Sequence, residues 1–541
     1  MKKTSIIGFV LALLPFGTAF AQQADTVNQM PHLEIPEITI IGKKAITLPF
    51  ARKGEIYDID LYEAPQPDVS LFGPAPSMSL LRGSLPRYRQ EEKPWRLSLE
   101  GLGGSFGTMS GRGFLNYIGQ QWGADWNLGF KKTNGHTDNA DATSFKAGAG
   151  AHSLFRTDNT AFKTFRASVD AAYEHNRYGL FGIPGGTARR RLSDFELRSG
   201  FNSLNREGTV IDIDLAAMFE SLNDSNLGID SSVSSVSPDL SASLSADIKS
   251  VRLSTGISYR NTSPDYSHPT QAPSMVDYFL SARFNLNPAW SIEAGGRVAH
   301  SENNIGGERS LVTPFGSAKL ILDSTFSVSL WFKPEMQFTS YPEYVKRIPY
   351  LAHEFTIDPE RRPAVIGSSF FYNNGPLSLE VRGSFLQSTN TPVVLSDSGR
   401  IRLDYVEATQ TALNIEGALQ LTNITKVLFS ASVTGAYEKD SSSQLPMIPV
   451  VRMDGTWETD FRIPIKAWST VEYLSKRNID RAGTRSLGDV FLVNAGASTD
   501  IIPRIALAAE LKNLFDVNYE WWNGYRAPGV QFNVTAKINI Q

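Results

Sequence analysis

The sequence has no cysteine in its 541 residues. This absence excludes a disulfide scaffold, thiolate metal sites and thiol catalysis. The formal net charge is only −3, so the charge balance gives no reason to expect nucleic acid or a strongly charged partner. No apolar run beyond residue 21 is long enough for a transmembrane helix. If the protein crosses a membrane, we therefore expect it to cross with strands.

The N-terminus has the three parts of an export signal. Lys2 and Lys3 give a positive start, residues 6–16 form an apolar stretch too short to span a bilayer, and Ala19 and Ala21 form an A-x-A cleavage site. We interpret residues 1–21 as a Sec signal peptide that is removed on export. An uncleaved membrane anchor is the alternative interpretation.

From Trp95 onward the dominant pattern is an alternation of apolar and polar residues. It is clearest at the C-terminus, where residues 530–541 alternate without a break. Segments of roughly ten to thirteen alternating residues recur, for example at 165–173, 377–385 and 427–437, and a tilted transmembrane strand needs about this length. The pattern predicts strands with one apolar face, although a soluble sandwich would alternate as well.

The connections between these segments are alternately short and long. The short ones are rich in Asn, Asp, Gly and Pro and lie at 119–121, 156–160, 205–208, 287–289, 323–324 and 374–375. The long polar ones lie at 133–141, 175–191, 223–237, 261–274, 337–360, 388–399 and 515–528. Outer-membrane barrels have short periplasmic turns and long extracellular loops. The sequence therefore predicts an all-β fold, a transmembrane antiparallel β-barrel of about 22 strands.

The C-terminal part of the sequence resembles a known family. Residues 510–520, which read ELKNLFDVNYE, and the following Gly-Tyr and Pro-Gly pairs at 524–529 resemble the end of TonB-dependent receptors. Residues 445–449 and 348–360 resemble two further segments of that family. The resemblance runs from about Trp95 to Gln541. It implies a 22-stranded barrel in the outer membrane of a Gram-negative-type bacterium, which imports scarce nutrients with energy from TonB.

The region before the barrel departs from that family. TonB-dependent receptors carry a globular plug inside the barrel, whereas only residues 22–94 lie here between the signal peptide and the first strand. Prolines recur in this region and favour extended or disordered chain over a packed domain; they include Pro31, Pro36, Pro49, Pro65, Pro67, Pro74, Pro76 and Pro86. We therefore expect three parts: a signal peptide (1–21), a periplasmic segment without a full plug (22–94) and a barrel (95–541).

One stretch of the N-terminal segment is a candidate contact site. Residues 36–42, which read PEITIIG, resemble the TonB box of the family. The candidate contact residues for TonB or another periplasmic partner are Glu37, Ile38, Thr39, Ile40 and Ile41. Such a stretch can add a strand to an exposed sheet edge in a partner. A β-prone stretch in an inert tail is the alternative.

Motifs for catalysis and metal binding have simpler explanations. Residues 103–107 fit G-x-S-x-G, but a nucleophile elbow needs a helix after the serine and residues 108–118 are predicted to form a strand. The seven histidines show no metal-binding spacing. Asn134, Asp138, Asn139 and Asp141 either hold calcium or form a polar surface loop. We predict that the protein is not an enzyme and has no cofactor.

Arginines and aromatic residues point to the membrane. The run Arg189 to Arg191 either contacts lipopolysaccharide phosphates or is a solvated charge run, which is the simpler interpretation. Aromatic residues beside the short turns, including Trp122, Trp126 and Trp290, fit interfacial girdles. The group Tyr519, Trp521, Trp522 and Tyr525 is either such a girdle or the lining of an extracellular ligand site.

Three functions remain open at this stage, of which a membrane-embedded enzyme ranks last because no nucleophile, base and orienting group can be assembled from the motifs. The first is transport of a solute across the outer membrane by a receptor-like barrel. The second is a structural, assembly or secretion barrel whose lumen is filled by a partner protein, such as a lipoprotein. In these first two cases we expect contacts with outer-membrane lipid and lipopolysaccharide. Because an unplugged barrel of this width would leave a wide aqueous channel, we expect inward-folded loops, chiefly 337–360, or a partner to narrow it.

Overall fold

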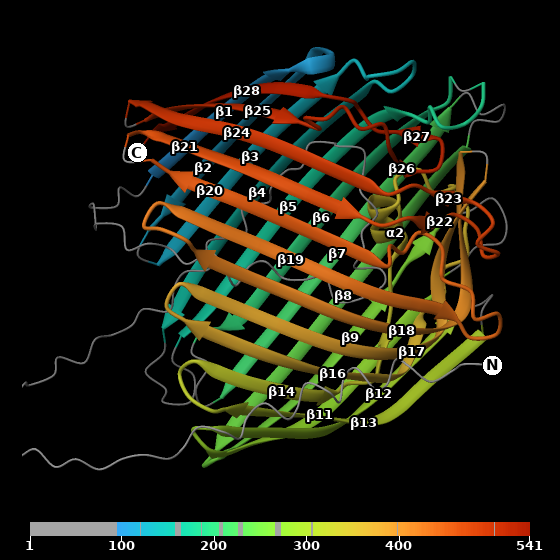
Figure 1. The fold of residues 1–541 in the computed structure, drawn as a ribbon. Helices are drawn as coiled ribbons and strands as arrows, with labels where there is room; N and C mark the ends of the chain where they lie inside the picture. The colour runs from blue at the N-terminus through green and yellow to red at the C-terminus, as the bar shows by residue number, and fades with distance from the viewer. Residues whose placement is uncertain are drawn as a thin grey trace, which may run out of the picture. The chain divides into compact units, whose positions relative to one another are not determined.

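The computed structural model describes residues 95–540 except 120, 157–163, 186, 205–208, 226–230, 266–271, 304–306, 398, 462 and 503. These residues form one large antiparallel sheet that closes into a barrel (Figure 1). The long strands are β1 (Trp95–Gly104), β2 (Thr108–Ile118), β3 (Trp122–Thr133), β4 (Ala142–Arg156), β5 (Thr164–Gly179), β6 (Arg189–Ser203), β7 (Val210–Ser225), β8 (Ser231–Ile248), β9 (Val251–Asn261), β11 (Ser274–Asn287), β12 (Trp290–Asn303), β13 (Gly307–Ile321), β14 (Phe326–Phe332), β16 (Glu360–Asn374), β17 (Leu377–Asp397), β18 (Arg400–Gln420), β19 (Thr425–Glu438), β20 (Val451–Asp460), β21 (Ile465–Leu474), β24 (Val490–Ile502), β25 (Ile505–Lys512) and β28 (Gln531–Ile540).

The described sheet has 24 strands, of which two are short continuations. β10 (Ser263–Pro264) pairs with β8 as β9 does, and β15 (Glu335–Gln337) pairs with β16 as β14 does. Pro334 has no N–H to donate at the break between β14 and β15. Counting each pair as one strand gives 24 − 2 = 22, which confirms the predicted barrel.

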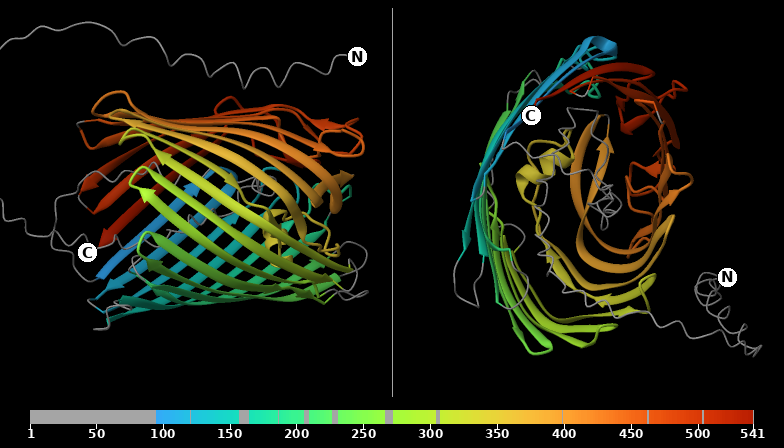
Figure 2. Two further views of the ribbon diagram at one scale, coloured as in Figure 1. Left: turned by 90° about the horizontal axis from the view of Figure 1, so that it is seen from below. Right: turned by 90° about the vertical axis from the view of Figure 1, so that its left-hand side faces the viewer.

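Closure of the barrel joins its first and last strands. β1 pairs with β28 in an antiparallel register from Leu97↔Ile540 to Gly104↔Asn533. Figure 2 shows the resulting ring of strands along the barrel axis. Each of the 22 strands counted in this way therefore has two hydrogen-bonded neighbours, so the described sheet has no free edge strand.

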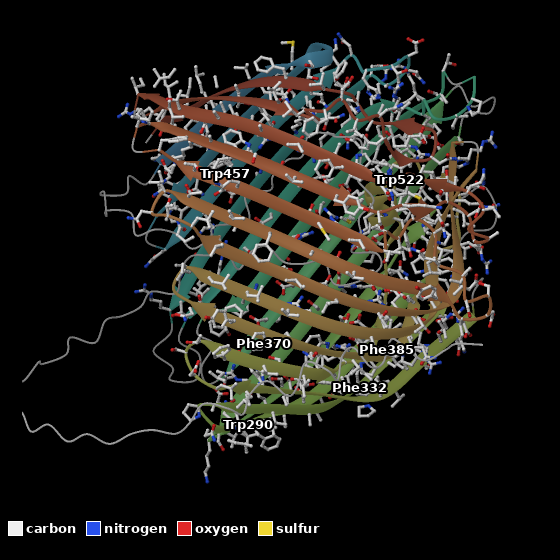
Figure 3. The ribbon with its side chains drawn as sticks, viewed as in Figure 1. Trp290, Phe332, Phe370, Phe385, Trp457 and Trp522 are labelled. Carbon is white, nitrogen blue, oxygen red and sulfur yellow. The ribbon has the colours of Figure 1, made fainter. Side chains whose placement is uncertain are left out.

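The alternation of side chains separates an apolar exterior from a polar lumen. On β28, Phe532 and Val534 are 49% and 42% exposed, whereas Asn533 is 8% exposed and faces the lumen. Trp290, Phe370, Phe385 and Trp457 lie on the exterior in the same way (Figure 3). An apolar belt of this kind is stable in lipid, where the closed sheet satisfies its backbone groups internally. None of the described helices is long and apolar enough to cross a bilayer.

The two ends of the barrel differ in their connections. Short turns such as 288–289, 322–325 and 375–376 gather at one end, which we call the short-turn end. The longer connections gather at the other, the long-loop end. Three predicted loops were too long. Strands β5 and β6 continue into 175–191, β7 and β8 continue into 223–237, and β17 extends through most of 388–399. Their Asn, Ser, Asp and Pro content is typical of loops, but strand pairing overrides it here.

Candidate functional site

The mouth of the barrel at the long-loop end contains a packed hydrophobic core. The connection between β15 and β16, residues 338–359, crosses this mouth and contains the short helix α2 (Tyr341–Arg347); we call it the inserted segment. It packs with the tip of the β17–β18 hairpin and with the loops before β20, β24 and β28. Figure 2 shows α2 and this hairpin tip inside the ring of strands. The prediction that the 337–360 loop folds inward is therefore confirmed.

Local sequence explains why α2 forms. Ser340 is its N-cap, and it forms a capping box with Glu343, whose Oε2 accepts a hydrogen bond from the Ser340 N–H at 2.7 Å. Pro342 lies in the first turn, where its missing N–H costs nothing. The buried side chains Tyr341 and Val345 attach α2 to the core, and the Tyr341 ring stacks on Phe355 at 5.1 Å. The segment is thus a folded unit rather than an extended loop.

The aromatic group near the C-terminus belongs to this core. Trp521, Trp522 and Tyr525 are each at most 3% exposed. The Tyr525 ring stacks on Tyr350 of the inserted segment with centroids 3.6 Å apart. Neither predicted role, an interfacial girdle or the lining of a ligand site, fits this burial. The aromatic side chains instead hold the loops together, because ring stacking across separate loops buries large apolar area.

A buried ion pair fastens the inserted segment to the barrel wall. Arg190 of β6 forms a bidentate pair with Asp224 of β7, with N–O distances of 2.6 and 2.7 Å, and both side chains are at most 2% exposed. Its Nη1 also donates to the carbonyl oxygens of Pro349 and Leu351 at 2.7 Å. Tyr178 of β5 donates its hydroxyl to the same Pro349 oxygen at 2.7 Å. Arg190 therefore neutralises the Asp224 carboxylate in the barrel wall and also donates hydrogen bonds to two backbone carbonyl groups of the inserted segment.

Residues Arg189 to Arg191 are therefore not the solvated charge run that was the simpler interpretation of the sequence. Arg190 is not solvated, and Arg189 forms a bidentate pair with Asp141 at 2.7 and 2.8 Å. Only Arg191 is exposed. Arg189 also neutralises the charge of Asp141, so this carboxylate needs no calcium ion as a partner. The pairing favours the polar-loop interpretation of residues 134–141.

A second ionic contact lies beneath α2. Lys346 pairs with Asp194 of β6, whose strand neighbour on β7 is Glu220. Burial alone disfavours the ammonium, but the adjacent Asp194 carboxylate raises the pKa of Lys346 above its usual value. Glu220 is 3% exposed, and neither of its carboxylate oxygens has a hydrogen-bond donor among the described residues. The Lys346 ammonium therefore lies beside two neighbouring acidic side chains of the barrel wall, Asp194 and Glu220.

A third contact fastens the far end of the segment. Arg309 of β13 pairs with Asp358 at 2.7 Å, and the Tyr405 hydroxyl donates to the Thr356 oxygen at 2.9 Å. Asn390 donates to Asp358 at 2.6 Å from a bulge in β17, where its φ is +62°. Asparagine tolerates this left-handed conformation better than most residues. The bulge bends the tip of the hairpin toward the inserted segment.

Arg477 joins the last two loops of the mouth. It is fully buried and donates to the carbonyl oxygens of Glu520 at 2.9 Å and Trp521 at 3.3 Å. Its guanidinium also lies 5.6 Å from the centre of the Trp521 ring, within cation–π range. Burial lowers the pKa of Arg477 to about 10. The loops that close the mouth are therefore fastened to one another as well as to the wall.

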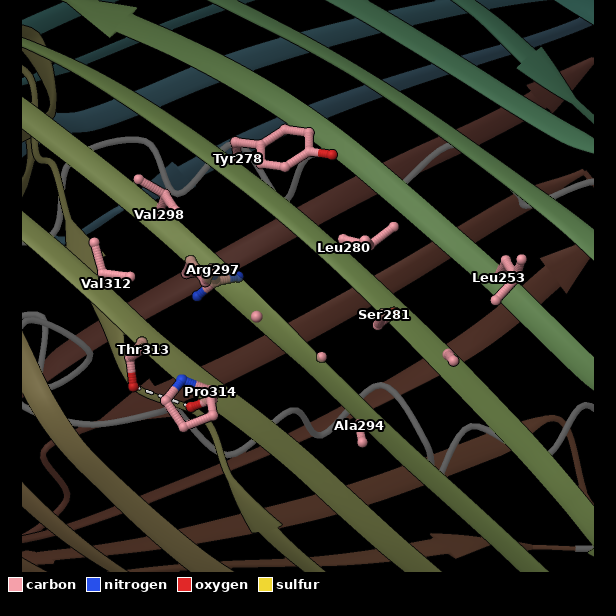
Figure 4. Close-up of a pocket in the computed structure, with 13 residues that line it drawn as sticks. Leu253, Tyr278, Leu280, Ser281, Ala294, Arg297, Val298, Val312, Thr313 and Pro314 are labelled. Carbon is pink, nitrogen blue, oxygen red and sulfur yellow. Dashed lines mark hydrogen bonds between the residues drawn. The ribbon is translucent and has the colours of Figure 1, made fainter.

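Two recesses stand out on the described surfaces of the barrel. One, of about 370 Å³, lies in the lumen below α2, between polar side chains of β5 to β9 that include Asp170, Arg198, Asp214 and Asp239. The other, of about 690 Å³, is an apolar notch on the exterior over β11 to β13 (Figure 4). Small residues at Ala282, Ala294 and Gly296 form its floor, and lipid is the medium that this surface faces. Only the lumenal recess lies on a route through the barrel.

The structure also places the remaining candidates. Residues 37–41 lie outside the described residues. Ser105 of the G-x-S-x-G motif is in a turn between β1 and the strand β2, and its hydroxyl bonds to the backbone N–H of Phe532 at 2.8 Å, so the motif is not a nucleophile elbow. No group of His, Asp and Glu in the described part of the chain is arranged to hold a metal ion. The sequence did not predict the buried role of Arg190, although Arg190 has the same parity as Leu192 and Asp194, which places all three side chains on one face of β6.

Comparison with solved structures supports this fold. The FrpB iron transporter from Neisseria meningitidis has a TM-score of 0.68 at 10% identity, over 83% of this chain and 82% of that chain. The ferric yersiniabactin uptake receptor FyuA from Yersinia pestis has a TM-score of 0.65 at 13% identity, over 84% and 81%. The copper transporter OprC has a TM-score of 0.65 at 12% identity, over 84% and 81%. These neighbours are TonB-dependent receptors, which confirms the predicted resemblance at the level of fold. No family model matches the chain, and no curated protein is significantly similar in sequence.

Proposed function

We propose that this protein moves a solute across the outer membrane through its lumen and that the inserted segment is the closure of this path. The observation that supports the proposal most directly is the fastening of residues 338–359 across the mouth of a 22-stranded barrel. Besides the hydrophobic core, the segment is fastened to the wall by polar contacts at Arg190, Lys346 and Asp358, and polar contacts can be exchanged for contacts with a solute or water. A wide barrel without such a closure would breach the membrane.

The location and energy source belong to the same proposal. The long-loop end faces the outside of the cell, residues 1–21 direct export by the Sec pathway, and lipopolysaccharide forms part of the surrounding lipid. Residues 37–41 lie in the periplasm and pair with TonB, which supplies the energy for opening. The neighbours named as copper, iron and ferric yersiniabactin transporters support import as the direction of transport.

A second function has one observation in its favour. Apolar rings face the lumen as well as the lipid, since Phe114 shares the lumenal parity of Ser98 and Asn127 and is 38% exposed. An exposed ring on a polar wall suits contact with a protein more than passage of a small polar solute. The alternative proposal is therefore an assembly or secretion barrel whose lumen holds a partner protein.

Conductance of the purified full chain in planar lipid bilayers tests the closure. We expect the native protein to conduct weakly and a variant with residues 341–355 replaced by a short Gly-Ser linker to conduct as an open pore. Asp247→Asn, which breaks an exposed ion pair with Arg252 at the short-turn end, is the matched control and should leave conductance unchanged. Full conductance of the native protein, or no increase in the linker variant, would contradict the proposed closure.

A further inference from the structure

A row of cationic side chains lies on the outer face of neighbouring strands near the long-loop end. The register places Lys132 of β3 opposite Thr143 of β4, Thr143 opposite Arg177 of β5, and Arg177 opposite Arg191 of β6. We call Lys132, Arg177 and Arg191 the cationic row. All three side chains are exposed, and none has an ion pair or hydrogen bond in the described structure. The three positive charges thus lie within four neighbouring strands and have no charged partner among the described residues, and Arg177 and Arg191 are directly adjacent.

The apolar belt begins directly below this row. Leu128, Tyr173 and Phe195 are 55%, 39% and 40% exposed and lie four residues further from the long-loop end on the same three strands. At about 3.3 Å per residue and a tilt of roughly 40°, the row lies about 10 Å above these side chains along the membrane normal. This separation places the cationic row at the level of lipid headgroups.

The described strands provide no acidic partner for the cationic row on this face. The outward positions of the described strands β3 to β8 contain neither Asp nor Glu. Asp141, which lies just before β4 on this face, is already paired with Arg189.

Elsewhere near the long-loop end the exterior also carries acidic side chains. Lys439 pairs with Glu407 at 2.8 Å, and the outer face of β12 and β13 carries Glu302 and Glu308. The positive charge is therefore confined to one arc of the barrel.

The geometry of the row calls for an anion. Arg177 and Arg191 are direct cross-strand partners, and like charges in this arrangement repel each other. An anion between them removes the repulsion, and guanidinium groups match phosphate oxygens through paired hydrogen bonds. We propose that the cationic row binds the phosphate groups of the lipopolysaccharide lipid anchor in the leaflet around the long-loop end. The choice of this lipid rests on the proposed outer-membrane location.

Binding of lipid A to the purified full chain tests the inference. The probes are fluorescent lipid A with both phosphates and the same lipid with both phosphates removed. One basic residue beside an anionic membrane surface contributes about fivefold to binding, so Arg177→Gln with Arg191→Gln should weaken binding about 25-fold and the triple variant with Lys132→Gln about 100-fold. Lys439→Gln, at an exposed cation that already has a carboxylate partner, is the matched control and should change binding less than twofold.

The inference would be overturned if the triple variant bound lipid A as tightly as the native chain, or if the native chain bound the phosphate-free lipid as tightly as lipid A. Displacement of lipid A by inorganic phosphate at micromolar concentration would also overturn it, because that result would identify a site for free phosphate. Heat-dependent electrophoretic mobility of the variants confirms that each barrel is folded before binding is compared. Weakened lipid A binding in the triple variant supports the row even if the conductance experiment fails, so the two proposals are tested separately.

Discussion

Arg190 shows how one side chain in this barrel serves two structures. Its guanidinium is fully buried, faces Asp224 on the neighbouring strand and donates to two carbonyl oxygens of the inserted segment. Burying two charges is costly, and the cost is offset here because every charged oxygen and several N–H groups are hydrogen-bonded. Removing one partner should therefore be far more harmful than removing both.

We expect Asp224→Ala to lower the free energy of unfolding by about 3–5 kcal/mol, because it leaves Arg190 buried without its carboxylate. The double variant Arg190→Met with Asp224→Leu should recover much of this loss. Unfolding by urea in lipid vesicles measures both. Asp247→Ala, in the exposed pair with Arg252, should cost less than about 1 kcal/mol, and a similar cost for Asp224→Ala would contradict the role of the buried pair.

Val534 tests the register of the last strand. It is 42% exposed on the exterior, so we expect Val534→Arg to lower the free energy of unfolding by roughly 2–4 kcal/mol, since a charge on the lipid face loses its hydration. The neighbouring Thr535 faces the lumen beside Leu102 and Ala508 in the register. Thr535→Arg is the matched control and should cost much less, because its charge remains in water. Equal costs in vesicle unfolding would refute the assignment of faces.

At the scale of elements, the important unit is the inserted segment with α2. A helix of seven residues is not stable alone, and α2 depends on its capping box and on the aromatic core around it. Its ionic contact is Lys346 with Asp194, in which the carboxylate raises the pKa of the lysine. A raised lysine pKa means that the contact stabilises the closed form fully below the ordinary pKa of 10.5 and is lost as the pH rises beyond it.

We therefore expect low conductance from pH 7 to pH 10 and an increase above about pH 10.5, as Lys346 loses its proton. Lys346→Arg keeps its charge in this range and should stay closed, which makes it the matched control. Burial raises the pKa of Tyr344 and of Tyr525, so these side chains in the same core stay neutral in that window. Arg477, whose pKa is lowered by burial to about 10, titrates within the window and is unchanged in the Lys346→Arg control. The same increase in Lys346→Arg would show that another group opens the mouth.

At the scale of the whole molecule, opening of the closed mouth needs a connection between the barrel and an energy source. The proposed contact is residues 37–41 of the N-terminal segment, which precede the barrel. A strand that adds to a partner sheet needs its backbone N–H groups, so a proline within it removes a hydrogen bond.

We expect single cysteines at Ile38 or Ile40 to crosslink to TonB in living cells, and a proline at the other position to reduce the crosslink several-fold. The natural sequence has no cysteine to interfere. A cysteine at Asp25, outside the stretch that resembles a TonB box, is the control and should not crosslink. Capture of another periplasmic protein instead would favour the assembly barrel, and capture of nothing would identify the stretch as an inert tail.

The sequence by itself determined the strands and their faces. Alternation is a local property: Phe532 and Val534 are on one face of a strand in any fold, and repeated alternation separated by short and long connections fits one closed sheet of this size. For the same reason residues 108–118 were identified as a strand in spite of the G-x-S-x-G motif before them.

Only the tertiary structure decided what happens at the mouth. Residues 391–397 contain turn-forming side chains, yet they form the extended tip of β17, because contacts with Asp358 and the inserted segment stabilise the bulge at Asn390. Arg190 belongs to a run that is typical of a solvated loop, yet it is buried against a carboxylate on the next strand and carbonyls about 160 residues away. Such contacts join distant parts of the chain, and no local pattern contains them.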